Sequence, residues 1–339
     1  MNSLALLSCL ILCFSVFTEA SYKYSYDYKS PPPPKKSGYP SSPPKKSTFG
    51  IGFYSKSCPQ AEGIIRKAVF KAVLMNPGIA AGIIRMHFHD CFIRGCDGSV
   101  LLDSVPGKET AEKDSPINNP SLRGFGVIDE AKALLEKVCP HTVSCADILA
   151  YAARDSAFFV GGIKYLFQVI QNLPPPFFDA KQLEDNFKAK GLSLDEMVTL
   201  SGAHSIGVSH CSSFSNRLYG FNATHPQDPS LDPRYASFLK NKCPRPMSDT
   251  QDDPIVNLDV SSPIHLDNKY YLNLRNHKGL LTSDQTLYES PSTSKLVLNN
   301  VKFRSTWARK FANAMVHMGS IEILIGNKGE IRKNCHFIN

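Results

Sequence analysis

The sequence predicts a mainly α-helical globular protein behind an extended amino-terminal segment. From residue 49 onward, apolar residues recur at helical spacing in several long stretches. Strand signals there are few and short, and no internal repeat is visible. With 339 residues, 42% of them hydrophobic and 20% charged, the chain is long enough for one large domain or two small ones.

The first twenty residues are typical of a secretory signal peptide. They are apolar from Leu4 to Phe17 and end with small residues at Thr18 and Ala20. This run is too short to span a membrane, and no later stretch is long and apolar enough to do so. We therefore expect a secreted protein with no membrane-spanning segment.

Residues 21–48 differ in composition from everything that follows. Seven prolines, six lysines and five tyrosines fall here with one Asp, so the segment carries +5 of the chain's net charge of +8. Such a composition cannot bury a core and should stay extended, partly as polyproline II. Ser30 followed by Pro31–Pro34 resembles the repeats of extensins, the hydroxyproline-rich plant wall proteins, although a solvated linker is an equal alternative. The rest of the chain is nearly neutral, and no nucleic-acid motif accompanies the basic residues, so we expect no nucleic-acid partner.

The globular part, residues 49–339, is expected to be built from helices. Residues 61–75 show the pattern well, because Ile64, Ile65, Ala68, Val69, Ala72 and Val73 fall on one face. The last expected helix contains Trp307, the only tryptophan. The expected helices span Ala61–Met75, Ile79–Ile93, Arg123–Val138, Val143–Val160, Asp179–Lys190, Ser193–Ser201, Tyr270–Lys278 and Ser305–Met318.

The cysteines indicate disulfides. Two of the ten, Cys9 and Cys13, lie in the signal peptide, and an even number in the rest of a secreted chain predicts four bonds. A zinc site is the weaker alternative, because no C-x-x-C pair occurs. Spacing alone leaves the pairing open. The remaining cysteines are Cys58, Cys91, Cys96, Cys139, Cys145, Cys211, Cys243 and Cys335.

The most informative segment is Arg85–Leu102, which reads R-M-H-F-H-D-C-F-I-R-G-C-D-G-S-V-L-L. Arg85 and His89 are four residues apart and share one helical face, where a cation and an imidazole can handle a small polarised ligand together. Such a run can bind a metal, transfer protons, or do both. A metallohydrolase site built from His87, His89 and Asp90 is a weak alternative, since the two histidines point to different faces of one helix.

A second cluster surrounds His204, in the run L-S-G-A-H-S-I-G from Leu200 to Gly207. The small residues around this histidine should let a large, flat group approach the backbone closely. Acid and hydroxyl side chains recur in Leu258–Asn268 and Ser283–Gln285, and such oxygen ligands suit a hard cation.

Taken together, these motifs resemble the secreted plant haem peroxidases, class III of the plant, fungal and bacterial superfamily. The resemblance covers about Phe49 to Cys335 and rests on R-x-x-F-H-D-C-F-x-x-G-C-D-G-S, E-K-D-x-x-x-N, R-G-F, V-S-C-A-D-I-L, L-S-G-A-H-S-I-G, L-D-N-x-Y-Y and S-D-Q. It implies the haem peroxidase fold, in which two helical halves sandwich one haem b and bind two Ca²⁺ ions. It also implies four disulfides, which are Cys58–Cys139, Cys91–Cys96, Cys145–Cys335 and Cys211–Cys243.

On one side of the haem, the resemblance makes His89 the base that takes a proton from hydrogen peroxide and returns it to the leaving oxygen. Asn118 would hydrogen-bond this histidine, and Arg85 would stabilise the negative charge that grows as the O–O bond breaks. Phe88 would pack over the haem, and Pro174 would line the channel through which donors approach.

On the other side, His204 would be the axial ligand of the haem iron. Asp284 would accept the second ring N–H of this histidine and give the imidazole anionic character.

The resemblance also implies two calcium sites, each adjoining a catalytic histidine. The distal site would comprise Asp90, the carbonyls of Ile93 and Gly95, Asp97 and Ser99, with Glu112 acting through water. The proximal site would comprise Ser205, Asp259, Ser262, the carbonyl of His265, and Asp267.

The function that this resemblance implies is a peroxidase that reduces hydrogen peroxide and oxidises small phenols by one-electron steps. We expect a monomer in the extracellular space or cell wall rather than the vacuole, active in wall and lignin metabolism or the response to oxidative stress. Its basic tail could contact wall polymers, and Asn222 in N-A-T is a glycosylation sequon. The alternative is a catalytically impaired variant that serves as an extensin-like structural wall protein.

The chain departs from the family pattern after Gly162. The family normally continues through a V-P-x-G-R-R-D segment that is absent here, and an Arg of that segment normally pairs with the residue at Asp147. Stranding a buried carboxylate can cost roughly 3–5 kcal/mol, out of a typical total stability of about 5–15 kcal/mol. We therefore expect the chain to fold poorly, although all catalytic residues are present.

Overall fold

The computed structural model describes residues 52–93, 95–164, 176–245, 253–320, 324 and 329–339. The described residues all belong to one compact unit, Phe49–Asn339. The predicted signal peptide, the predicted proline-rich segment and Pro174 lie outside the described residues.

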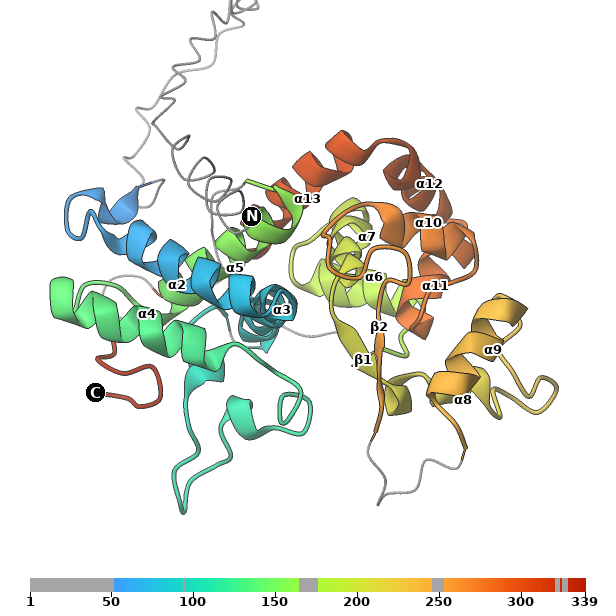
Figure 1. Ribbon diagram of the computed structural model, residues 1–339, viewed down its shortest axis with the longest axis horizontal. Helices are drawn as coiled ribbons and strands as arrows, with labels where there is room; N and C mark the ends of the chain where they lie inside the picture. The colour runs from blue at the N-terminus through green and yellow to red at the C-terminus, as the bar shows by residue number, and fades with distance from the viewer. Residues whose placement is uncertain (1–51, 94, 165–175, 246–252, 321–323, 325–328) are drawn as a thin grey trace, which may run out of the picture. The chain divides into compact units, whose positions relative to one another are not determined.

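Four helices form the amino-terminal half of this unit, and they pack on one another (Figure 1). Their common core includes Ile65, Ile83, Ile128 and Leu149. The helices are α2 (Ala61–Met75), α3 (Gly78–Ile93), α4 (Phe125–Val138) and α5 (Cys145–Gly161).

Six helices form the second half, around a core that contains Tyr271, Trp307 and Phe311. Two of them begin with capping boxes, in which Asp179 pairs with Gln182 and Ser193 pairs with Glu196, so their start points are set by local sequence. The helices are α6 (Ala180–Ala189), α7 (Leu194–Ser201), α10 (Lys269–Arg275), α11 (Thr282–Glu289), α12 (Ser294–Lys302) and α13 (Arg304–Met318).

A small third core lies beside the second half. Strands β1 (Val208–His210) and β2 (Ile255–Asn257) pair antiparallel, with Ser209 opposite Val256, and helices α8 (Ser215–Leu218) and α9 (Pro233–Lys242) follow β1. Short 3₁₀ turns complete the described structure at Phe53–Ser55, Ser99–Leu101, Glu112–Asp114, Gly202–Ser205 and Cys211–Ser213.

Helix α3 joins the two halves. Ile83 on this helix belongs to the first core, whereas Ile84 and Phe92 belong to the second. A helix that is apolar on almost every face is buried in a protein interior. The polar residues of α3 are thereby held where the two halves meet.

The predicted helices are confirmed, each to within three residues of its ends. Helices α8, α9, α11 and α12 were not predicted. For α9 the signals were present, because Asp232 caps the helix by accepting the N–H of Tyr235 and Pro233 occupies its first turn.

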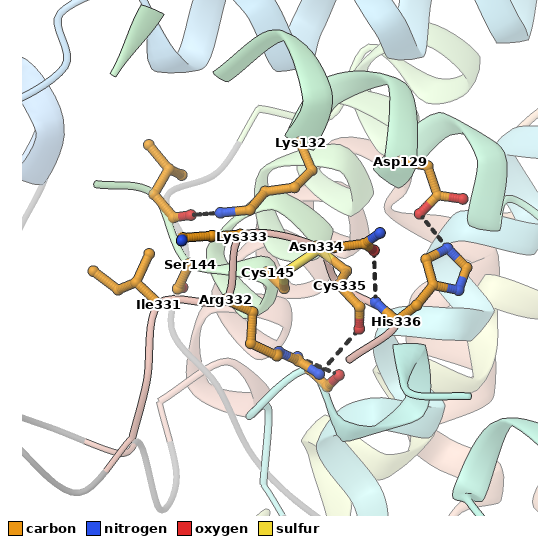
Figure 2. The surroundings of a disulfide bond; sticks show 12 residues. Asp129, Lys132, Ser144, Cys145, Ile331, Arg332, Lys333, Asn334, Cys335 and His336 are labelled. Atoms are coloured by element: carbon orange, nitrogen blue, oxygen red, sulfur yellow. Dashed lines mark hydrogen bonds and ion pairs between the residues drawn. A yellow bond between two sulfur atoms is a disulfide. The ribbon is translucent and has the colours of Figure 1, made fainter. Parts of the chain in front are cut away.

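All four disulfides implied by the resemblance are present. The bond from Cys145 to Cys335 ties the carboxyl-terminal segment to the start of α5 (Figure 2). Next to it, His336 Nε2 lies 3.0 Å from Asp129 Oδ1 and His336 Nδ1 lies 2.9 Å from Asp103 Oδ2. These hydrogen bonds raise the pKa of His336 against the opposing effect of its partial burial. The last residues of the chain are therefore fastened to α5 by a covalent bond and to α4 by the contact between His336 and Asp129.

The expectation that Asp147 is a stranded buried carboxylate is wrong. This residue is only half-buried, and its Oδ2 accepts the hydroxyl of Tyr54 at 2.5 Å and that of Ser144 at 2.6 Å. Its backbone N–H also bonds Ser144 Oγ at the start of α5. Two hydroxyl donors thus satisfy the carboxylate without an Arg, and the reason for expecting poor folding is removed.

Candidate active site

Arg85 and His89 lie one turn apart on α3, as their spacing predicts. Arg85 Nε–H donates to His89 Nε2 at 3.1 Å. The two outer nitrogens of the guanidinium donate to the carbonyl oxygen and hydroxyl of Ser121, at 3.2 and 3.0 Å. The guanidinium is therefore hydrogen-bonded to His89 through Nε and to Ser121 through its two terminal nitrogens, which keeps its charge beside the imidazole.

Asn118 fixes which nitrogen of His89 carries the proton. The Asn118 side-chain N–H₂ donates to the carbonyl of Glu112 at 2.6 Å, so its Oδ1 is the acceptor that faces His89 Nδ1, also at 2.6 Å. His89 Nδ1 must then donate, which leaves Nε2 as the unprotonated nitrogen. A histidine in this tautomer can take up a proton at Nε2.

The surroundings keep His89 neutral. Burial, followed by the charge of Arg85, lowers the pKa of His89 to about 3, and the bond to Asn118 opposes this only partly. Burial and the nearby Arg123 lower the pKa of Arg85 to about 10, which still leaves it charged at neutral pH. A neutral base therefore lies beside a permanent cation.

His204 and Asp284 form the second half of the site. His204 Nδ1–H donates to Asp284 Oδ1 at 2.7 Å. The same oxygen accepts the hydroxyl of Tyr270 at 2.8 Å, and Asp284 Oδ2 accepts the backbone N–H of Leu281 at 3.1 Å. Burial works to raise the pKa of Asp284, but the charge and hydrogen bond of His204 lower it overall, so the group is an ionised acceptor.

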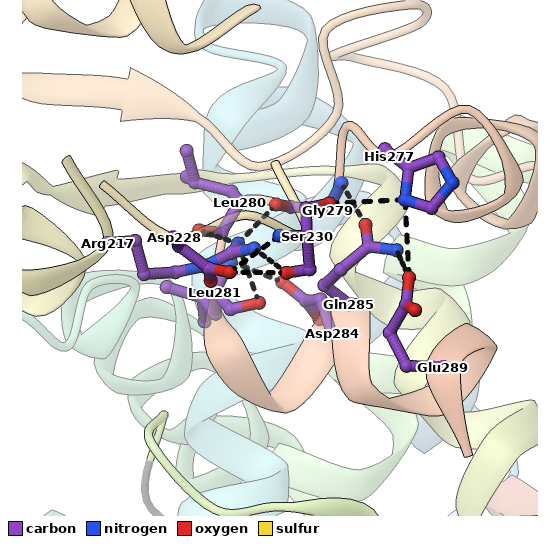
Figure 3. A network of polar contacts seen from close by, with 10 residues as sticks. All are labelled: Arg217, Asp228, Ser230, His277, Gly279, Leu280, Leu281, Asp284, Gln285 and Glu289. Atoms are coloured by element: carbon purple, nitrogen blue, oxygen red, sulfur yellow. Dashed lines mark hydrogen bonds and ion pairs between the residues drawn. The ribbon is translucent and has the colours of Figure 1, made fainter. Parts of the chain in front are cut away.

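The segment that carries Asp284 is anchored by a fully buried arginine (Figure 3). Arg217 Nε donates to Asp228 at 2.7 Å, and Nη1 donates to the carbonyls of residues 279–281 at 2.5, 2.8 and 3.1 Å. These residues lead directly into α11, where Asp284 lies in the first turn. Arg217 therefore fixes the approach of this carboxylate to His204.

The geometry fits an axial ligand for a haem. With Nδ1 engaged by Asp284, the free nitrogen of His204 is Nε2, and 38% of the side-chain surface remains accessible. Burial lowers the pKa of His204, but the charge and hydrogen bond of Asp284 raise it overall against a smaller opposing effect of Arg85. A Cβ at Gly207, three residues after His204, would lie 3.3 Å from the Cβ of Ala81 on α3, so the segment of His204 packs against the helix that carries His89.

Gly202 lies against two aromatic side chains. A Cβ at this position would lie 2.6 Å from the Tyr271 hydroxyl and 2.8 Å from Trp307 Nε1. The small residue therefore allows these two side chains to pack closely against the segment that carries His204.

The structure argues against the metallohydrolase alternative, because His87 and His89 do not face a common site. His87 lies against Cys91, with Nδ1 3.2 Å from the sulfur, whereas His89 faces Arg85 and Asn118. Within the described residues, His87, Cys91 and Cys96 are the one set of three His, Cys, Asp or Glu side chains whose ligand atoms all lie within 4.8 Å of one another, but both sulfurs are joined in a disulfide. A thiolate is what binds metal, so the oxidised pair is not a ligand.

Carboxylates gather behind His89. Asp90 is fully buried and, among the described residues, accepts two backbone N–H groups, from Gly98 at 3.2 Å and Val100 at 3.5 Å. Burial, followed by the charge of Asp97, raises the pKa of Asp90 well above its usual range, and Glu112 adds to this effect. Such a repulsive cluster of oxygen ligands suits a divalent cation.

The neighbours of this cluster hold its loop in place. Ser99 donates its hydroxyl to Glu112 at 3.0 Å, and its backbone N–H bonds Asp97 at 2.8 Å. Arg332, from the carboxyl-terminal segment, donates to the carbonyl of Gly98 at 2.6 Å. Figure 2 shows Arg332 beside the disulfide of Cys335, so the covalent bond also steadies this loop.

A second oxygen cluster lies behind His204. Asp259 Oδ1 accepts three N–H groups, but Asp259 Oδ2 is buried and has no hydrogen-bond partner among the described residues. Ser262 donates to Asp267 at 3.0 Å, and the Asp267 N–H donates to Ser205 at 3.2 Å. A buried carboxylate oxygen without a donor is costly unless a cation completes it, so this set also fits Ca²⁺.

The predictions for the carbonyls of Ile93, Gly95 and His265 stay predictions, as does the role of Phe88. Phe88 packs against Phe92, with ring centroids 4.1 Å apart, and lies next to His89.

Sequence reasoning missed Tyr270 and Arg217. The Y-Y of the L-D-N-x-Y-Y motif was a signal for Tyr270, whereas nothing singled out Arg217.

Comparisons with known proteins all identify peroxidases as similar to this chain. The family model described as peroxidase matches residues 65–302. The chain is 53% identical over 302 residues to Peroxidase 5 of Vitis vinifera, covering 85% of this chain and 91% of that protein. It is 46% identical over 305 residues to Peroxidase 2 of Zea mays, covering 85% and 89% of the two chains. It is 47% identical over 310 residues to Peroxidase 1 of Zea mays, covering 87% and 84%.

Proposed function

The chain belongs to the peroxidase family and is a haem peroxidase, and from that premise we propose how its own residues do the work. His89 is the acid–base group for hydrogen peroxide, Arg85 its electrostatic partner, and His204 the axial ligand of the haem. Small phenols are the electron donors, and two Ca²⁺ ions support the site.

The observation that carries this proposal is that the two histidines have different hydrogen-bond partners. His89 presents an unprotonated Nε2 beside a cation, whereas His204 has its Nδ1–H held by an ionised Asp284. The first arrangement suits a base, and the second suits a metal ligand with added electron density.

Proton transfer follows from the His89 tautomer. Nε2 takes a proton from hydrogen peroxide and later gives it to the departing oxygen, which leaves as water. Asn118 keeps the ring oriented throughout because it accepts from Nδ1. Arg85, anchored on Ser121, offers its charge to the oxygen that becomes negative. When bound, the haem would supply the iron centre that gives two electrons to the peroxide and recovers them one at a time from the phenolic donors.

The calcium proposal rests on the two oxygen clusters. Asp90 follows His89 in the sequence, is fully buried, and has one backbone N–H on each of its oxygens. Asp259 has a buried Oδ2 with no hydrogen-bond partner among the described residues. Cations at these positions would stiffen both sides of the haem site, with the ligand sets given above from the resemblance.

The setting of the protein is proposed as extracellular, in or near a cell wall, with the protein a monomer. Within the described residues no helix is long and apolar enough to cross a membrane. Asn222 is exposed in a turn, where its side chain accepts three local donors, so the sequon is open to glycosylation. The alternative of an impaired structural protein has no support over the enzyme, because the matching family and relatives are peroxidases.

Reconstitution with and without calcium tests the proposal. The full chain, purified with hemin and Ca²⁺, should bind one haem and oxidise guaiacol only when hydrogen peroxide is present. Chelation should lower activity and the free energy of unfolding, by about 2.7 kcal/mol for each site previously saturated at 100 times its Kd. Haem uptake without peroxide-dependent oxidation would contradict the enzymatic proposal, and an unfolding midpoint insensitive to chelation would contradict the calcium proposal.

A further inference from the structure

We propose that Tyr270 is a positioning residue that sets the strength of the axial ligand. Its hydroxyl competes with His204 for one oxygen of Asp284, and so limits how strongly Asp284 draws the proton on His204 Nδ1. This inference rests on the proposed role of His204 as the ligand of the haem iron.

The contact geometry carries the argument. The Tyr270 hydroxyl donates to Asp284 Oδ1 at 2.8 Å, and His204 Nδ1–H donates to the same atom at 2.7 Å. Because an ionised carboxylate can only accept, the tyrosine must be the donor. The other oxygen, Oδ2, is engaged by the N–H of Leu281 at 3.1 Å, so no second free oxygen relieves the competition.

The burial of this group makes the contact strong. Tyr270 and Asp284 are each 2% exposed, and the tyrosine ring stands edge-on to the His204 ring with centroids 6.3 Å apart. In such an interior, water cannot replace the hydroxyl, and a charge-assisted hydrogen bond is about twice as strong as a neutral one.

The hydrogen bond from Tyr270 should change the basicity of the His204 imidazole, and not only hold side chains in place. A second donor on Oδ1 spreads the carboxylate charge, so Asp284 accepts less strongly from His204. Partners of this kind set the basicity of a ligating imidazole and through it the potential of the metal. Removing the hydroxyl should make His204 more anionic and bind the iron more tightly.

The neighbouring tyrosine is a matched control. Tyr271 is also buried, but its hydroxyl donates to the carbonyls of Val198 and Thr199 in α7, at 2.8 and 2.9 Å, and accepts from Trp307. Losing this hydroxyl removes three buried hydrogen bonds, against one at Tyr270, without touching the carboxylate of Asp284.

Resonance Raman spectra and potentiometry on the holoprotein test the inference. In Tyr270→Phe, the iron–histidine stretching band of the ferrous protein should move to higher frequency, and the ferric/ferrous potential should fall. Tyr271→Phe should leave both at wild-type values. An unmoved band in Tyr270→Phe, or an equal shift in Tyr271→Phe, would overturn the inference.

A second substitution covers the case in which Tyr270→Phe fails to fold. Site-specific 3-fluorotyrosine at position 270 keeps the size and the hydroxyl but donates more strongly, so the band should move to lower frequency; no movement would count against the inference. If the wild-type holoprotein shows no iron–histidine band at all, the ligand assignment of His204 fails, which is a different outcome from an insensitive band.

Discussion

Replacing His89 with Ala should lower kcat/KM for hydrogen peroxide by about 100- to 10,000-fold, the range in which a positioned acid–base group contributes. The loss follows from the geometry, because Nε2 of His89 is the unprotonated nitrogen held beside Arg85. Burial and the nearby cation keep it neutral, with a pKa lowered to about 3, so no ordinary working pH blocks it by protonation.

Stopped-flow measurement of the reaction with hydrogen peroxide gives this number directly. His317→Ala is the control, since His317 lies on α13 and bonds Glu196 at 2.6 Å, and it should leave the rate unchanged. A His89→Ala protein that binds haem and reacts within tenfold of the wild type would contradict the role of His89.

Replacing Arg217 with Ala should destabilise the protein by roughly 3–5 kcal/mol, because it leaves the buried Asp228 carboxylate without its partner. It also removes the donor to three consecutive carbonyls in residues 279–281. Since those residues lead into the helix that holds Asp284, haem retention should fall together with stability.

Denaturant unfolding monitored by circular dichroism measures this effect. Arg275→Ala, at an exposed position on α10, should change the free energy of unfolding by no more than about 0.5 kcal/mol. The double substitution Arg217→Met and Asp228→Leu should recover much of the loss, because it removes both charges together. An Arg217→Ala protein as stable as the Arg275→Ala control would show that the buried pair does not hold this region.

Much of the fold could be predicted because its signals are local. The apolar spacing in Ala61–Met75 marks α2 to the residue, and the motifs around His89 and His204 indicate the chemistry of each half of the site. The disulfide pairing came from the resemblance rather than from spacing, and it is confirmed.

The remainder depends on contacts between distant parts of the chain. Tyr54 reaches Asp147 across 93 positions, and this pair replaces the arginine whose absence suggested poor folding. Arg217 reaches residues 279–281 across more than 60 positions. Gly202 is small because Tyr271 and Trp307 lie against it, which no neighbouring residue in the sequence indicates. Such pairings are set by the packing of whole helices, so no local pattern predicts them.

The most direct test of the account is a hemin titration of the wild-type protein and of His204→Gly, with and without added imidazole. We expect the wild type to bind one equivalent of hemin and to oxidise guaiacol with hydrogen peroxide. His204→Gly should lack both the axial ligand and the activity, and free imidazole should restore both in part by occupying the place of the lost ring. An unchanged Soret band and full activity in His204→Gly without imidazole would contradict the assignment of His204 as the ligand and, with it, the arrangement of the whole site.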